Sequence, residues 1–123
     1  MGRLGLIDDA DRPRVLPVTF ALLGERIYSA IDNKPKAPGV PARVRYLRRR
    51  PEAALTVDRY DDDWSELAWV QVLGRIDVVD ADDEPAAMAA LAAKYEPYRR
   101  DPPPGPLLRL TPERALHWRA NAD

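Results

Sequence analysis

One stretch of the chain, residues 67–79, alternates regularly between two kinds of side chain. Every second residue is aliphatic or glycine: Val70, Val72, Gly74, Ile76 and Val78. The residues between them are a mixture of aromatic, polar, aliphatic and charged types: Trp69, Gln71, Leu73, Arg75 and Asp77. Because side chains alternate across a strand, the pattern predicts a long strand with one face in a core and one partly covered by a ligand or another subunit. Its length favours a curved barrel strand.

Other segments predict further strands around this long one. Strand-forming residues, bounded by turn formers, fill residues 3–8, 14–22, 26–31 and 53–60. We expect the first three of these segments to form a meander, joined by turns at residues 9–13 and 23–25. A last strand region is expected at residues 107–110, with a second piece at 115–119 after Thr111 and Pro112.

Two segments predict helices. Residues 42–49 are rich in helix formers and lie between two prolines, of which Pro51 ends the helix because its ring excludes continuation. Residues 84–95 are rich in alanine and carry an apolar stripe at helical spacing: Met88, Leu91, Ala92 and Tyr95. We interpret that stripe as core packing. About six strands and two helices favour a mainly β fold, a small closed barrel, over a layered parallel sheet.

Length and composition indicate one ordinary soluble domain. The 123 residues fit a single domain spanning 1–123, and no apolar run is long enough to cross a bilayer. The absence of cysteine excludes disulfides, thiolate metal sites and cysteine nucleophiles. The first residues lack the apolar core of a secretion signal, so we expect a cytoplasmic protein without a membrane partner.

Positive charge is concentrated in one part of a chain whose net charge is only -1. Residues 33–50 contain no acid and seven basic residues: Lys34, Lys36, Arg43, Arg45, Arg48, Arg49 and Arg50. Clustered cations repel one another unless solvent or a ligand offsets the repulsion. The cluster therefore indicates an anion site, most simply for a phosphate held by the loop and the start of the following helix. The alternative is a solvated basic face.

The sequence offers little apparatus for acid–base or nucleophilic catalysis. Its one histidine, His117, lies in a strand-like segment typical of packed or surface residues, and neither Ser29 nor Ser65 lies in a nucleophile elbow. The aspartates at 61–63 are interpreted as a solvated turn and not as a metal site, because consecutive carboxylates do not converge on one ion. Glycine-rich dinucleotide and nucleotide motifs are absent. Cations for phosphate and aromatics for stacking then favour a protein whose coenzyme carries the reactivity.

Three runs of sequence carry a family resemblance, which extends over about residues 3–118. They are Pro17-Val18-Thr19-Phe20, the stretch from Ile27 to Lys36 with its Lys-Pro-Lys, and the stretch from Asp58 to Ser65 with its Tyr-Asp-Asp-Asp-Trp. They resemble the pyridoxamine 5'-phosphate oxidase-like split-barrel proteins, and within them the deazaflavin-dependent branch. The resemblance implies an FMN-binding split β-barrel and a homodimer with two sites at the subunit interface. It also implies binding of coenzyme F420, or alternatively FMN.

The same resemblance implies particular site residues. Ser29, Lys34, Lys36 and Arg43 would bind the phosphate. The backbone of Pro17, Val18 and Thr19 would run beside the ring system. Trp64 and Trp69 stand where family members place aromatics near the cofactor or across the dimer interface, and the alternative for both is packing without cofactor contact.

The sequence also departs from the family pattern. Family members commonly begin with a helix, whereas here a strand is expected from Arg3, so that helix is missing or the start is truncated. Asn33 and Arg59 stand where the family tends to have histidine. Pro38, Gly39 and Pro41 interrupt the basic helix. We therefore expect the first turn of this helix to be remodelled.

Three hypotheses about function follow. The first is an oxidoreductase that transfers hydride between the deazaflavin or flavin ring and a small organic substrate, with no side chain assigned as catalytic. The second is a carrier that binds the coenzyme without turnover. The third, a nucleic-acid-binding barrel, is disfavoured by the slightly acidic net charge.

Overall fold

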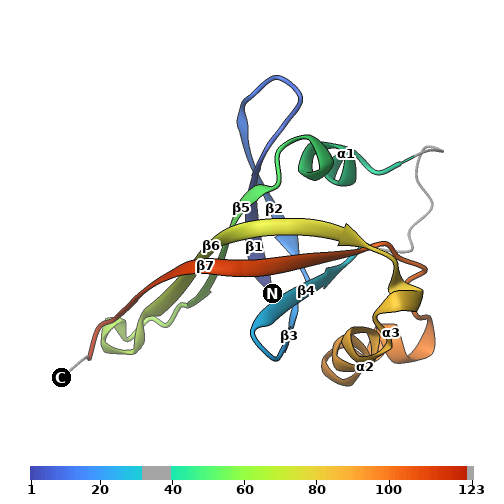
Figure 1. Ribbon diagram of the computed structural model, residues 1–123. Coiled ribbons are helices and arrows are strands. Elements are labelled where there is room, and N and C mark those ends of the chain that lie inside the picture. The colour runs from blue at the N-terminus through green and yellow to red at the C-terminus, as the bar shows by residue number, and fades with distance from the viewer. Residues whose placement is uncertain (32–39, 122–123) are drawn as a thin grey trace.

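The computed structural model describes residues 1–31 and 40–121. Over these residues the chain forms seven antiparallel strands in one curved sheet, three α-helices and two short 3-10 turns (Figure 1). The strands are β1 (Gly2–Ile7), β2 (Pro13–Val18), β3 (Ala21–Leu23), β4 (Arg26–Ala30), β5 (Glu52–Arg59), β6 (Ala68–Val79) and β7 (Leu107–Arg119). The helices are α1 (Ala42–Arg49), α2 (Pro85–Lys94) and α3 (Glu96–Arg100), and the 3-10 turns are η1 (Trp64–Glu66) and η2 (Ala81–Asp83). The mainly β prediction is confirmed.

The strand order is β2-β1-β5-β6-β7-β4-β3. β2 and β3 therefore occupy opposite ends of the sheet, although only Thr19 and Phe20 separate them in sequence. The sheet must curl so that its two ends meet, which is the geometry of a barrel. The expected single strand at residues 14–22 and the three-stranded meander are both wrong. The chain breaks at Thr19 and Phe20, and its two halves pair with different neighbours, β1 and β4.

The long central strand is confirmed, and its partner is longer than expected. β6 pairs along its whole length with β7, which is one continuous strand where two pieces were expected. A register shift between Leu73 and Gly74 leaves Glu113 unpaired and bends the ribbon. Gly74 is required there, because a Cβ on this residue would lie 2.2 Å from the Thr111 carbonyl oxygen.

Two apolar clusters lie on the two faces of the sheet. Inside the barrel, side chains of β1, β4, β5, β6 and β7 pack with Val44 and Leu47 of α1. Outside it, Tyr28, Ala30 and Leu107 pack against Ala87 and Leu91 of α2, which confirms the apolar stripe as core. β4 thus contributes to both clusters by alternation, with Ile27 inward and Tyr28 outward.

Both expected helices are present, and one further helix was missed. α1 has the expected bounds, and α2 differs by one residue at each end. α3 was not expected, because it is a single short turn that begins one residue before Pro97. Among the described residues no helix is long and apolar enough to cross a membrane.

Candidate functional site

The break between β2 and β3 lies beside the segment expected to face the coenzyme ring. Pro17 is exposed, Val18 is buried in the barrel and Thr19 is half-buried. The Thr19 hydroxyl lies 2.8 Å from the hydroxyl of Tyr98. The segment is therefore fixed from outside the barrel by α3 and from inside by the core.

The backbone of Phe20 is bound by two residues at the end of α2. The Phe20 N–H donates to the Tyr95 hydroxyl at 3.1 Å, and that hydroxyl lies 3.2 Å from the Phe20 carbonyl oxygen, to which it donates. The Lys94 ammonium donates to the same carbonyl at 2.7 Å and lies 3.4 Å from the centre of the Phe20 ring. The helical spacing predicted only core packing for Tyr95 and gave no indication of these contacts. Two tyrosines three residues apart, Tyr95 and Tyr98, were the available signal, because a buried tyrosine usually needs a partner for its hydroxyl.

Ser29 faces the interior of the barrel. Its side chain is buried, and its Oγ has no hydrogen-bond partner among the described residues. It borders a cavity of about 10 Å³ with apolar neighbours that include Val18 and Phe20. The structure thus brings Ser29 next to the strand break. A phosphate is much larger than this cavity, so contact between the Ser29 hydroxyl and a phosphate requires rearrangement of the barrel wall, and the phosphate role of Ser29 stays a prediction.

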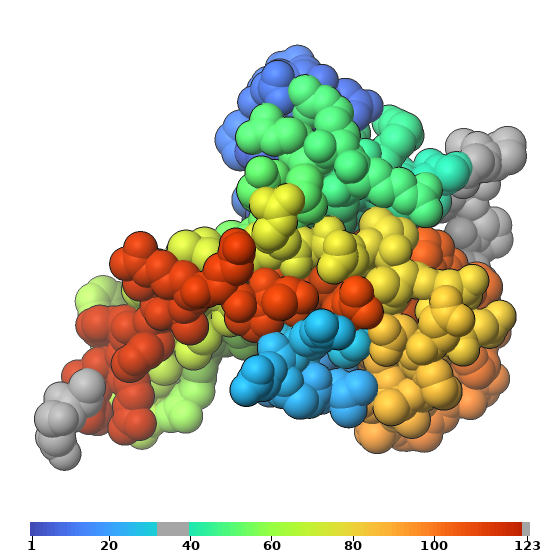
Figure 2. Space-filling model, in the orientation of Figure 1, coloured from blue at the N-terminus to red at the C-terminus, as the bar shows by residue number. Residues whose placement is uncertain are grey.

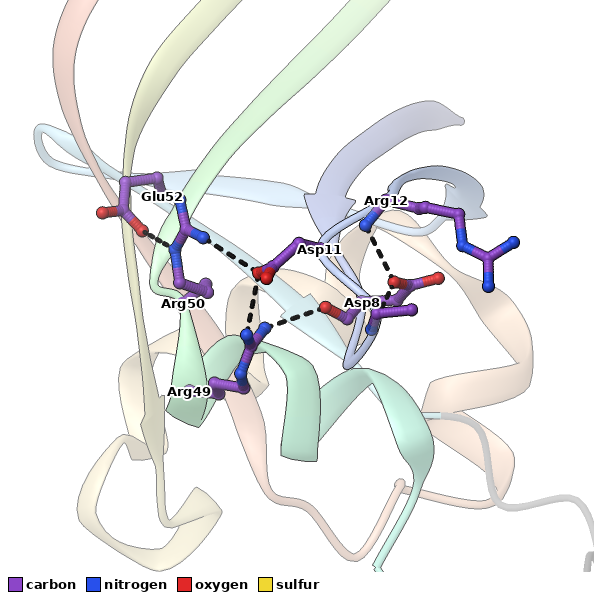
Figure 3. A network of polar contacts seen from close by, with 7 residues as sticks. Asp8, Asp11, Arg12, Arg49, Arg50 and Glu52 are labelled. Carbon is purple, nitrogen blue, oxygen red and sulfur yellow. Dashed lines mark hydrogen bonds and ion pairs between the residues drawn. The ribbon is translucent and has the colours of Figure 1, made fainter.

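The basic helix α1 divides into paired and unpaired arginines. Arg45 lies 3.2 Å from Asp9, and Arg50 lies 3.2 Å from Asp11. Arg49 donates to the Asp11 carboxylate at 2.7 Å and to the carbonyl of Asp8 at 2.9 Å. Arg49 and Arg50 connect the C-terminal end of α1 to the β1–β2 loop (Figure 3), and the Arg45–Asp9 pair adds a third connection. Part of the positive cluster is therefore neutralised within the chain, which the sequence analysis did not foresee.

The space-filling view shows how the β1–β2 hairpin packs against α1 at the molecular surface. The tip of the β1–β2 hairpin, in dark blue, lies against the green residues of α1 and the start of β5 (Figure 2).

Backbone N–H donors of Arg12 and Ala10 lower the pKa of Asp8, with Arg12 giving the largest contribution. The hydrogen bond from Arg49 lowers the pKa of Asp11 and correspondingly raises that of Arg49.

Arg43 differs from these paired arginines. It lies in the first turn of α1, is half-buried, and has no ion-pair partner among the described residues. The same turn contains no acid, and its N-cap residue, Pro41, provides no side-chain cap. Free N–H groups and a cation together form a site that suits an anion. Lys34 and Lys36, the other two expected phosphate ligands, lie outside the described residues.

Trp64 and Trp69 lie on a projection that we call the aromatic arm. It consists of the ends of β5, β6 and β7 with the η1 turn, and extends beyond the barrel (Figures 1 and 2). Its exposed aromatic residues are Tyr60, Trp64, Trp69 and Trp118. Trp69 and Trp118 are directly opposite each other on β6 and β7. The arm is distinct from the strand break, so within one chain the structure does not place the two tryptophans beside Pro17, Val18 and Thr19.

An apolar groove of about 430 Å³ opens on the outer face of the sheet. Its floor includes the small residues Gly5 and Ala54, and its walls include Val15 and Leu73. Leu73 and Trp69 are on the same face of β6, because strand side chains alternate. The mixed face predicted for this strand is therefore a partly exposed surface that joins the groove to the aromatic arm.

Asp63, Glu84 and Arg109 have structural roles, whereas His117 is exposed. Asp63 accepts from the backbone and hydroxyl of Ser65, which lower the pKa of Asp63, so this loop is a capped turn as predicted. His117 is exposed on β7 opposite Val70. Among the described residues no group of three or more metal-ligating side chains is arranged to hold a metal ion. Arg109 connects Glu84 at 2.9 Å with Asp77 at 3.5 Å, and Glu84 also accepts from Tyr28 at 3.2 Å.

Comparisons with solved structures find the same fold in other proteins. The conserved hypothetical protein Rv2991 from Mycobacterium tuberculosis has a TM-score of 0.72 at 16% identity, over 98% of this chain and 77% of that one. The heme storage protein HutZ from Vibrio cholerae has a TM-score of 0.74 at 17% identity, over 96% and 84% of the two chains. An FAD-binding protein from Mesorhizobium loti has a TM-score of 0.69 at 19% identity, over 94% and 81%. At these identities the likeness concerns the fold alone.

The sequence itself has no match among curated proteins. A family comparison, however, matches residues 1–116 to the family described as pyridoxamine 5'-phosphate oxidase. The match extends from β1 through most of β7 and so includes the strand break, α1 and most of the aromatic arm. Together with the seven-stranded split barrel, it shows that the chain belongs to the pyridoxamine 5'-phosphate oxidase family.

Proposed function

We propose that the protein is an oxidoreductase that binds coenzyme F420, or alternatively FMN, and transfers hydride between its ring and a small organic substrate. The observation that carries the proposal is the first turn of α1. Among the described residues Arg45, Arg49 and Arg50 are paired, whereas Arg43 and the exposed Arg48 have no ion-pair partner. Arg43 alone of these two lies in the first turn, which has neither an acid nor a capping side chain. This turn therefore suits the phosphate end of the coenzyme.

Each part of the chain would then have a separate role. Arg43, together with Lys34 and Lys36, would hold the phosphate. The backbone of Pro17, Val18 and Thr19 would border the ring; Pro17 is an exposed residue, and Tyr98 fixes the Thr19 hydroxyl. The coenzyme would supply the hydride chemistry, and the chain would bind it and exclude water. No side chain is assigned a proton-transfer role.

We further propose that two copies of the chain form the complete site. Exposed tryptophans are uncommon on the surface of a monomer, and large apolar patches mark interaction sites. The aromatic arm carries Trp64, Trp69 and Trp118, and the neighbouring groove has apolar walls. In a homodimer the arm of one subunit would bring Trp64 and Trp69 toward the partner's site. A cytoplasmic location belongs to the same proposal.

Direct titration tests the coenzyme assignment. Purified protein is titrated with F420 and with FMN, each oxidised and reduced, and binding is followed by fluorescence. Saturable binding is expected for at least one coenzyme, and its absence for both rejects the proposal. Arg43→Ala should weaken binding about tenfold or more, as expected for loss of a charge-assisted hydrogen bond. Arg45→Ala, which removes a paired arginine of the same helix, serves as the matched control and should bind like wild type.

A heme-binding protein is a second candidate, distinct from the coenzyme carrier of the sequence analysis. His117 is exposed on β7 beside Trp118, and heme iron is commonly held by histidine. HutZ is named a heme storage protein, and a second neighbour, from Mycobacterium smegmatis, a heme binding protein. Titration with hemin, with His117→Ala as the control, separates this candidate from the first. Saturable hemin binding that depends on His117, with no binding of F420 or FMN, would favour the heme-binding protein.

A further inference from the structure

Phe20 is the residue at which the chain passes from one end of the sheet to the other. β2 ends at Val18 and β3 begins at Ala21, so the backbone N–H and C=O of Phe20 lie outside both strands. Buried or half-buried backbone groups need hydrogen-bond partners. In this structure the partners come from α2 and its C-cap residue, which are distant in sequence.

A single hydroxyl partners both backbone groups. The Tyr95 hydroxyl accepts from the Phe20 N–H at 3.1 Å and donates to the Phe20 carbonyl at 3.2 Å. A phenol has one proton to donate and lone pairs to accept with, so both bonds form at once. Phenylalanine at this position would keep the ring and lose both bonds. The Tyr95 hydroxyl is therefore the one partner of the Phe20 N–H among the described residues, and it shares the Phe20 carbonyl with Lys94.

The tyrosine itself is held in place by its neighbours. Its ring meets that of Tyr98 edge-on, with 5.6 Å between centroids, and Tyr98 in turn contacts the Thr19 hydroxyl at 2.8 Å. Lys94 adds a third bond to Phe20 at 2.7 Å. Residues 94–98 thus contact both residues of the break.

We propose that Tyr95 is a positioning residue of the coenzyme site, which acts through the backbone of Phe20 on the segment Pro17 to Thr19. The inference rests on the proposed function, because that segment is the one assigned to the ring. Tyr95 does not touch the ring itself. It fixes the direction in which the chain leaves β2, and thereby the surface that Pro17 and Thr19 present.

The test compares ligands with and without a phosphate. Riboflavin has the ring of FMN without its phosphate, and the deazariboflavin fragment of F420 serves in the same way. Tyr95→Phe should weaken the binding of FMN and of riboflavin by the same factor, about three- to tenfold. This is the size expected when a protein hydrogen bond is exchanged for one to water. Arg43→Ala should weaken the binding of FMN and leave the binding of riboflavin unchanged. The absorption spectrum of bound FMN should shift in Tyr95→Phe and not in Arg43→Ala.

Tyr28→Phe is the matched control. Tyr28 also packs against α2, and its hydroxyl bonds to Glu84 and not to the strand break. The same chemical change there should lower thermal stability and leave both affinities and the spectrum unchanged. If Tyr28→Phe weakens ligand binding as much as Tyr95→Phe does, the effect is general destabilisation and the inference is overturned.

The remaining outcomes separate this inference from the proposed function. Wild type that binds no coenzyme rejects the proposed function and the inference with it. Wild type that binds, with Tyr95→Phe equal to it in affinity and spectrum, overturns the inference alone. Where riboflavin binds too weakly to titrate, the spectrum of bound FMN decides. Should Tyr95→Phe not fold, Lys94→Met removes another bond to the Phe20 carbonyl and is compared by the same measurements.

Discussion

Arg49 of α1 and Asp11 of the β1–β2 loop form an ion pair at 2.7 Å, so the helix that carries four of the seven basic residues in 33–50 is tied to an acidic hairpin tip. Arg45 and Arg50 add pairs with Asp9 and Asp11. Such exposed pairs contribute modestly one by one. Their joint effect here is to fix the position of α1, and to leave Arg43 as the half-buried cation at its first turn.

This arrangement predicts a loss of stability in acid. The pKa of Asp11 is lowered chiefly by the hydrogen bond from Arg49, and that of Asp8 by the backbone N–H of Arg12. A carboxylate whose pKa is lower in the folded state stabilises the protein above its unfolded value, about 3.9, and loses that contribution as pH falls through the folded value. The melting temperature should therefore be steady from neutral pH to about 5 and fall below about 4.

Asp11→Asn tests the origin of this acid sensitivity. The variant should melt lower than wild type at neutral pH, and its melting temperature should depend less on pH below about 4. Asp62→Asn changes an exposed aspartate with no ion-pair partner among the described residues, and should keep the wild-type profile. Equal acid sensitivity in wild type and Asp11→Asn would show that this carboxylate does not carry the effect.

Gly74→Ala is expected to be strongly destabilising. Its Cβ would lie 2.2 Å from the Thr111 carbonyl oxygen, so β6 and β7 must separate at the bulge. Strain from overpacking typically costs about 1 to 3 kcal/mol, and backbone is less able to yield than a side chain. Urea unfolding measures the change in free energy. Gly5→Ala is the control within the same sheet, because its Cβ would come no closer than 3.7 Å to its nearest neighbour.

Local patterns explain which parts of the fold the sequence predicts. The alternation at residues 67–79 and the apolar stripe of α2 reflect contacts repeated at a fixed spacing. The strand and the stripe were both correct, but Val70 of the predicted core face is 44% exposed, because it lies on the aromatic arm beyond the barrel. The break at Thr19 and Phe20 has no such local cause. No turn former marks it, and the groups that stabilise it, Lys94, Tyr95 and Tyr98, lie far along the chain.

The candidate site was predictable to a similar degree. Segregation of charge indicated an anion site at α1. Nothing in the sequence pattern predicts that Asp9 and Asp11 pair with Arg45, Arg49 and Arg50. Pairing between distant segments depends on the tertiary fold. Arg43 was assigned through a family resemblance, and the structure adds a physical reason, its lack of a partner among the described residues. The inward direction of Ser29 follows from the register of β4, which periodicity alone does not give.

Trp69→Arg should weaken the proposed homodimer. Trp69 is 39% exposed and pairs with Trp118, which is 46% exposed, on the face that continues into the apolar groove. Placing a charge in a buried apolar contact carries a desolvation penalty. Sedimentation velocity should show a dimer for wild type and a shift toward monomer for the variant. Leu22→Arg, at an exposed residue of β3 away from the arm, is the control and should sediment like wild type.

Lys34→Ala and Lys36→Ala test the phosphate assignment of the two lysines that precede α1 in the sequence. Each ammonium is expected to make a charge-assisted bond to the coenzyme phosphate, so each variant should bind F420 or FMN about tenfold or more weakly. Neither should change the binding of riboflavin, which lacks the phosphate. Affinity for FMN should also fall with ionic strength, less steeply in the variants, because ions screen the attraction. If both variants bind FMN as wild type does, the assignment of Lys34 and Lys36 to the phosphate is wrong.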